Sequence, residues 1–96
     1  MMHELQCQYD TRKSFYKKAF IRETETKEVL HGELISYNTL VANYVYYKEQ
    51  NKKVFEYFGK YSQTTTRHQK EFFKQEGLTE KEIQKLFKNG KIEKYL

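Results

Sequence analysis

The sequence predicts an α+β fold, with an antiparallel sheet of three or four strands followed by two short helices packed on one face. Residues 1–59 contain alternating stretches rich in Tyr and Phe, which is typical of strands. Residues 60–96 carry apolar side chains at helical spacing after capping residues. The 96 residues contain no proline and no low-complexity linker, so we expect a single domain over 1–96, mainly β up to 59 and mainly α from 60.

The N-terminal segments are the least sharply defined. Residues 3–9 alternate apolar and polar side chains and fit a short strand, with a frayed terminal arm as the alternative. Residues 14–23 favour a strand, although several of their apolar residues are four apart, as in a helix. Residues 24–27 are expected to form the following turn.

Three further strands are expected at 28–37, 40–48 and 54–58, with a bulge at Gly32. Residues 40–48 have no clearly polar face, which predicts a central strand with helices on one side. A short polar connection at 49–52 makes 40–58 a β-hairpin.

Two helices follow. Ser62 or Thr64 is expected to cap a helix that runs to about Glu76 and stops at Gly77, with Phe72 and Phe73 facing inward. The second helix opens with a capping box, Thr79-Glu80-Lys81-Glu82, and ends at Asn89-Gly90. The tail 91–96 is basic, and either adds a last strand or remains loose.

The formal charge of +5, with a pI near 9.2, favours acidic partners. Only three of the 18 cationic residues are Arg, which weakens the case for base-specific recognition, because that role favours the planar guanidinium. The single Cys7 excludes an internal disulfide and suggests a reducing compartment. With no apolar run as long as a membrane span and no signal-peptide pattern, we expect a cytoplasmic protein that does not enter membranes.

Two groups of residues are candidate binding positions, for protein or nucleic acid. One is the Tyr- and Lys-rich hairpin, whose rings could stack on unpaired bases, although packing in the core is the more common role of each Tyr. The other is the start of the first helix, where hydroxyls and Arg67 could bind an anion, although helix capping alone explains the hydroxyls. The candidates are Tyr44, Tyr46, Lys48, Lys52, Lys53, Lys60, Thr65, Thr66, Arg67 and Lys70.

Catalysis is not expected, and neither is a cofactor. Residues Tyr61, Arg67, His68 and Glu71 could form a nuclease-like set, but Asp10 is the only aspartate and metal-dependent nucleases use clustered carboxylates. His68 is expected to be a packed side chain bonded to a carbonyl. No metal site is predicted, since a His3–Cys7 pair supplies two ligands and no second pair exists.

Three segments carry a resemblance: KSFYKKA at 13–19, SYNTLVA at 36–42 and YSQTTTRHQKEF at 61–72. Together they resemble a family of small bacteriophage and mobile-element proteins, and the YS-x-TT-x-RH-x-x-EF pattern is the most specific part. The chain departs from that pattern at Lys17, where glycine is frequent, and at Phe73, where an aliphatic residue is usual. The resemblance implies a phage accessory protein that acts in the host cytoplasm.

Two functions are therefore expected. The first is a non-enzymatic phage-type protein that binds and inhibits or modulates a host defence or nucleic-acid-processing complex, with anti-CRISPR activity as one form of anti-defence. The second is direct nucleic-acid binding through a basic, tyrosine-rich sheet surface and a helix N-terminus. Homodimerisation is left open, because a small sheet can leave a face for a second copy to cover.

Overall fold

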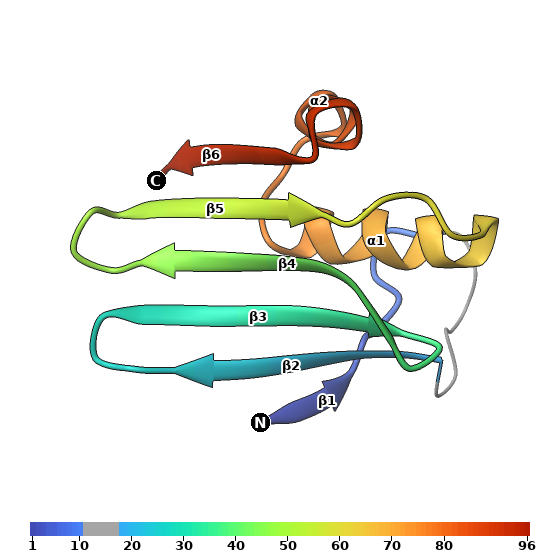
Figure 1. Cartoon of the computed structure of the whole chain (residues 1–96), viewed down its shortest axis with the longest axis horizontal. Coiled ribbons are helices and arrows are strands. Elements are labelled where there is room, and N and C mark those ends of the chain that lie inside the picture. The colour runs from blue at the N-terminus through green and yellow to red at the C-terminus, as the bar shows by residue number, and fades with distance from the viewer. Residues whose placement is uncertain (11–17) are drawn as a thin grey trace.

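The computed structural model describes residues 1–10 and 18–96. Within these residues, six strands form one antiparallel sheet in sequence order, and two helices connect the fifth strand to the sixth (Figure 1). The predicted α+β class is confirmed, but the prediction of three or four strands is wrong. The additional strands lie at the two ends of the chain, where short segments become strands by pairing with a neighbour.

The strands are β1 (Met2–Glu4), β2 (Ala19–Glu25), β3 (Val29–Ser36), β4 (Thr39–Tyr47), β5 (Lys52–Tyr57) and β6 (Lys91–Tyr95). β1 covers only the start of the strand expected at 3–9, because it pairs with β2 over just three residues. Of the strand expected at 14–23, residues 14–17 lie outside the described residues. β2 continues to Glu25, so the turn begins at Thr26, whose hydroxyl accepts a hydrogen bond from the Val29 amide at 3.1 Å.

The expected hairpin is confirmed. β4 pairs with β5 from Ala42↔Tyr57 to Tyr47↔Lys52, and it pairs with β3 on its other side. β4 is therefore an inner strand, as its apolar faces predicted.

The bulge expected at Gly32 is found elsewhere. The register between β3 and β4 shifts between Leu34 and Ile35, which leaves Val41 as the extra residue on β4. Gly32 instead lies under the ring of Tyr44 on the neighbouring strand, where an added Cβ would come within 2.1 Å of a ring carbon. A residue without a side chain is needed here to make room for a tyrosine in the core.

Both helices begin and end where the capping residues predict. α1 (Gln63–Gln75) has Ser62 as its N-cap, and Gly77 after it has a left-handed φ of 102°. α2 (Glu80–Asn89) has the complete capping box of Thr79 and Glu82, and ends at Gly90 with φ 84°. Within the described residues, neither helix is long and apolar enough to cross a bilayer.

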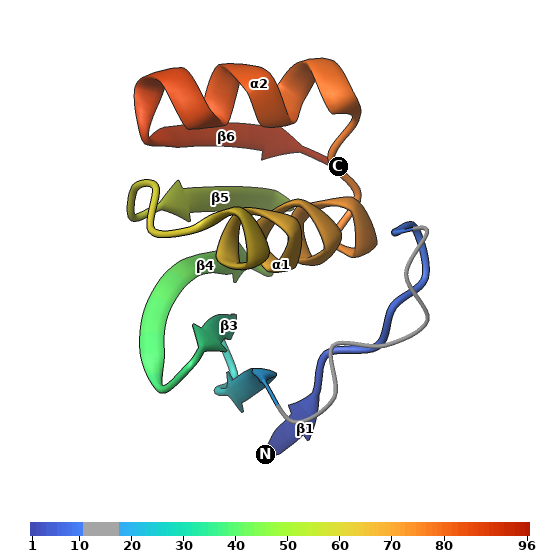
Figure 2. The ribbon, with the colours of Figure 1, turned by 90° about the vertical axis from the view of Figure 1, so that its right-hand side faces the viewer.

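The core lies between the helices and one face of the sheet. α1 packs against β3 and β4, and α2 packs against β5 and β6. Figure 2 shows α1 beside the middle strands and α2 along β6. Phe55 meets Phe73 edge-on at 6.2 Å, and Tyr57 stacks on Phe87 at 4.4 Å between ring centroids. The aromatic residues thus build much of the interior, and the opposite face of the sheet has no helix on it.

The N-terminal segment is fixed to α1 by one carboxylate. Glu71, which is buried, accepts hydrogen bonds from the backbone amides of Tyr9 and Asp10, both at 2.9 Å. Asp10 in turn accepts a 2.9 Å hydrogen bond from the guanidinium of Arg67. These contacts hold the chain after β1 against the helix.

Candidate functional site

The start of α1 is built for capping and packing. The Ser62 hydroxyl accepts the Thr65 amide at 3.1 Å, and the Thr66 hydroxyl donates to the Ser62 carbonyl at 2.9 Å. Thr65 is buried and its hydroxyl lies 3.0 Å from that of Ser36. The hydroxyl cluster is therefore occupied within the fold, so these groups are not oriented towards an external anion.

His68 is packed inside the protein. Its Nδ1 lies 2.8 Å from the Ser36 hydroxyl, and the predicted packed position is confirmed because the side chain is fully buried. Burial, followed by the nearby cations Arg67 and Lys18, lowers the pKa of His68 to about 4. A Ser–His pair resembles half of a catalytic triad, but both residues are at most 1% exposed, so a substrate has no access to this hydroxyl.

The predicted tyrosine surface does not form as expected. Tyr44 is on the helix-covered face of β4, 1% exposed, where its hydroxyl donates to Glu23 at 3.3 Å. Its ring contacts Phe55 and Phe72 and is not available for stacking on a base. Tyr46 is half-buried and donates its hydroxyl to Asn51 at 2.7 Å, within the same hairpin.

The predicted lysines of the hairpin each have a partner within the chain. Lys48 pairs with Glu25, and Lys52 lies 3.7 Å from Glu93. Lys53 pairs with Glu76 at 2.8 Å, and its ammonium lies 4.4 Å from the centre of the Tyr44 ring. These cations are largely neutralised by their own fold. Which carboxylate lies beside each lysine depends on the strand register and on helix docking, and the sequence alone does not reveal either.

The remaining candidates are scattered. Lys60 is exposed in the link between β5 and α1, and Lys70 is half-buried beside a small hollow that Tyr9 and Asp10 also line. Arg67 is bonded to Asp10. The ten predicted positions are therefore not brought together into one surface.

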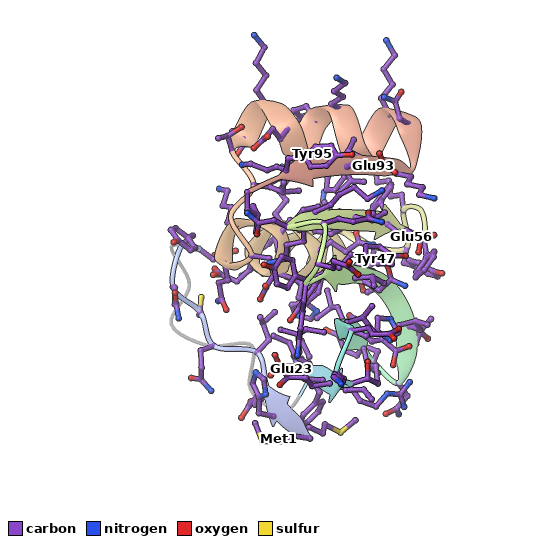
Figure 3. All side chains as sticks on the ribbon, turned by 90° about the vertical axis from the view of Figure 1, so that its left-hand side faces the viewer. Met1, Glu23, Tyr47, Glu56, Glu93 and Tyr95 are labelled. Atoms are coloured by element: carbon purple, nitrogen blue, oxygen red, sulfur yellow. The ribbon has the colours of Figure 1, made fainter. Side chains whose placement is uncertain are left out.

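A basic stripe on α2 and its end is the strongest charged feature of the described residues. Lys81, Lys85 and Lys88 are exposed and recur at intervals of four and three, which places them on one helix face. Lys91 follows at the start of β6 and is also exposed. We call Lys81, Lys85 and Lys88 the α2 lysine face; neither these three nor Lys91 form an ion pair among the described residues. Figure 3 shows nitrogen-tipped side chains that rise from α2 away from the sheet.

The local sequence explains this arrangement. Ile83 and Leu86 are buried and Phe87 stacks on Tyr57, which fixes one side of α2 against the sheet. The lysines between them must then face solvent. The spacing of these lysines is visible in the sequence, and a helical-wheel projection of 80–89 places them on one face. The sequence prediction placed the binding residues on the hairpin and the first helix, and so did not include them.

The uncovered face of the sheet has a different charge pattern. Arg22 lies 2.8 Å from Glu33, and Lys52 lies 3.7 Å from Glu93, so cations on this face stand next to carboxylates. It is therefore close to electrically neutral and does not favour a polyanion over other ligands. In the described residues, the cluster of neighbouring cations without an ion pair lies on α2 instead.

Metal chemistry finds no support in the described part of the chain, where no group of three or more His, Cys, Asp and Glu side chains is placed to hold an ion. The thiol of Cys7 is half-buried, and burial followed by the charge of Asp10 raises its pKa. A raised pKa disfavours the reactive thiolate form.

Fold and surface together define a small α+β protein with an antiparallel sheet, two helices on one face, and a cationic helix surface. The chain belongs to a family of unknown function (DUF8033), whose model matches residues 3–89. The comparisons with curated proteins and with solved structures found no match.

Proposed function

We propose that the protein is a non-enzymatic, cytoplasmic nucleic-acid-binding protein that contacts the phosphate backbone through the α2 lysine face. The observation that carries this proposal is the row of three exposed lysines on α2 that form no ion pair among the described residues. Lysines without carboxylate partners can neutralise phosphates and release the counterions condensed on the nucleic acid, and this release supplies most non-specific affinity. Lysine in place of arginine fits backbone contact better than reading of bases.

A catalytic role has less support. The Ser36–His68 pair is enclosed, and the hydroxyl cluster of α1 is used in capping. The polar groups that remain accessible lie on the protein surface, and such groups favour a binding role. The expectation of a phage accessory protein that binds a host defence or nucleic-acid-processing complex is compatible with this role and stays a prediction, because nucleic acid could be a component of that complex.

The test compares two variants with the same charge. Lys81, Lys85 and Lys88 are changed to Gln in one, and the exposed Lys18, Lys27 and Lys60 are changed to Gln in the other. Both lose three units from the formal +5. We measure binding to labelled single- and double-stranded DNA and to RNA by fluorescence anisotropy over a series of salt concentrations.

We expect the α2 variant to bind at least about tenfold more weakly at low salt, with the slope of log K against log[salt] smaller by about two to three on duplex DNA. The control variant should keep a slope near that of the wild type. Equal losses in both variants would contradict the α2 location, and absence of salt-sensitive binding by the wild type would contradict the function itself.

A further inference from the structure

The face of the sheet opposite the helices carries an ordered pattern of side chains. Pairing across the strands aligns one transverse row in the order Arg22, Glu33, Asn43, Glu56 and Lys91. Its charges read positive, negative, neutral, negative, positive. The labelled side chains of Tyr47, Glu56 and Glu93 lie on the side of the sheet away from α1 in Figure 3.

Two further rows run parallel to the first on the same face. One reads His31, Val45, Val54 and Glu93 from β3 to β6. The other reads Val29, Tyr47, Lys52 and Tyr95 across the same strands. Each row mixes apolar, aromatic and charged residues, so the face resembles the mixed surface of a protein interface more closely than a basic nucleic-acid platform.

One polar residue at the centre of the face is already buried in one copy. Asn43 is only 9% exposed although no helix covers it, and its side-chain oxygen has no hydrogen-bond partner among the described residues. Glu56, its register neighbour, has no ion pair within the described residues. A buried acceptor without a donor carries a desolvation cost that a binding partner can remove.

We propose that this face binds a second copy of the chain in a symmetric, face-to-face dimer whose two-fold axis runs parallel to the strands, between β4 and β5. Such an axis sets β4 over β5 of the second copy and β3 over its β6, and leaves each residue in its own row. Two sheets stacked in this way keep their strand directions within about 30° of each other, as in β-sandwiches.

The three rows are complementary under this symmetry. In the first row, Asn43 faces Glu56 of the second copy, whose carboxylate can accept from the Asn43 amide group, and Glu33 faces its Lys91, whose long side chain can reach towards the Asn43 oxygen. In the second row, Val45 faces Val54 and His31 faces Glu93. In the third row, Tyr47 faces Lys52 and Val29 faces Tyr95. Each contact occurs twice because the interface is isologous.

Neighbouring positions of the axis are worse. An axis over β4 sets Glu33 against Glu56 of the second copy, and an axis over β5 sets Glu56 against itself. An axis between β3 and β4 opposes Thr24 to Val54 and His31 to Val45, which buries polar groups against apolar ones. The pattern of charged and apolar residues together therefore selects one arrangement among the four, which leaves β2 and Arg22 outside the interface.

The first test uses disulfide cross-linking in a Cys7→Ser background. Residues 33 and 91 are three strands apart in one copy, about 14 Å, which is too far for a disulfide. We therefore mix the Glu33→Cys protein with the Lys91→Cys protein, oxidise, and separate the products on a non-reducing gel. The proposal predicts a covalent dimer in the mixture and only monomer for either variant alone.

The second test measures oligomeric state by sedimentation velocity over a range of concentrations. Val45→Lys puts two charges beside the axis, whereas Thr24→Lys adds the same charge on the same face but on β2, outside the interface. We expect dimers for the wild type and Thr24→Lys, and monomers for Val45→Lys with an unchanged circular dichroism spectrum.

Three outcomes would overturn the dimer. These are a monomeric wild type at every concentration, no cross-link in the mixture, and cross-linking of either single variant with itself. The dimer is independent of the lysine face, because the α2 lysines take no part in it. The nucleic-acid experiment and the dimer experiment can therefore fail separately.

Discussion

His68 couples the stability of the fold to pH. Its ring is fully buried between Ser36 and the ring of Tyr37, whose centroid lies 5.9 Å away. Desolvation and the Arg67 and Lys18 charges oppose its protonation, whereas Asp10 favours it weakly. In the unfolded chain the same imidazole takes up a proton near pH 6.5.

Because the pKa of His68 falls on folding to about 4, its neutral form stabilises the fold fully above pH 6.5, and this contribution is lost as the pH falls towards 4. The loss is roughly 3 kcal/mol over that interval. Urea unfolding measured between pH 7 and 4 tests this. His68→Gln should flatten the pH dependence, and an equally steep profile in that variant would contradict the assignment.

Gly32 is a second residue on which the packing of the core depends. A methyl group there would overlap the ring of Tyr44, which is held by Phe55 and Phe72 and cannot move away freely. We expect Gly32→Ala to lower the free energy of unfolding by about 1–3 kcal/mol.

The measurement is a double-mutant cycle with Tyr44→Leu, followed by urea denaturation. If the clash with the ring is the cause, the effect of Gly32→Ala becomes much smaller once Tyr44 is replaced. The same loss in both backgrounds would point to the backbone of β3 and away from the ring.

At the scale of elements, α1 organises contacts that are far apart in sequence. Its buried Glu71 binds the backbone of residues 9 and 10, and its Gln69 donates to the carbonyls of Val41 at 3.0 Å and Gly59 at 3.1 Å. The helix therefore holds the N-terminal segment, the bulge of β4 and the exit from β5 by polar side chains. This explains why a helix with a low apolar content is buried.

The anchoring role of Glu71 gives a prediction for this element. Glu71→Gln replaces charge-assisted hydrogen bonds to two amides by weaker neutral ones, which should cost roughly 1–3 kcal/mol. Hydrogen exchange followed by mass spectrometry should show faster exchange in the segment that contains Tyr9 and Asp10. Glu76→Gln, which removes the partner of Lys53, serves as the control and should leave this segment protected.

At the scale of the molecule, the positive charge is unevenly distributed. The cations of the sheet are mostly paired with carboxylates, whereas the lysines of the α2 lysine face form no ion pair among the described residues. A protein with this distribution attracts polyanions to one side and leaves the uncovered sheet face for contacts that need shape and alternating charge.

A pull-down from bacterial lysate, with and without nuclease treatment, tests the partner at this scale. If the contact is with nucleic acid, host proteins that copurify should be lost after nuclease treatment and on changing the three α2 lysines to Gln. Partners that survive both treatments would favour the direct contact with a host protein complex that the phage-type resemblance predicts.

The sequence by itself determined the types of most elements, because the signals for them are local. Ser62, Thr79 and Gly90 act within one helical turn, and the hairpin 40–58 follows from strand periodicity around a short polar loop. The packing role of Phe72 and Phe73 also follows from helical spacing.

Only the tertiary structure decided which of these residues remain accessible. Lys53 and Glu76 are 23 residues apart, and Arg67 and Asp10 are 57 apart, so their pairing depends on how distant elements dock. The same docking buried Tyr44, made β1 and β6 strands through their neighbours, and left the α2 lysines unpaired. Local sequence sets backbone conformation, but long-range packing decides which charges are neutralised, and therefore which surface can bind.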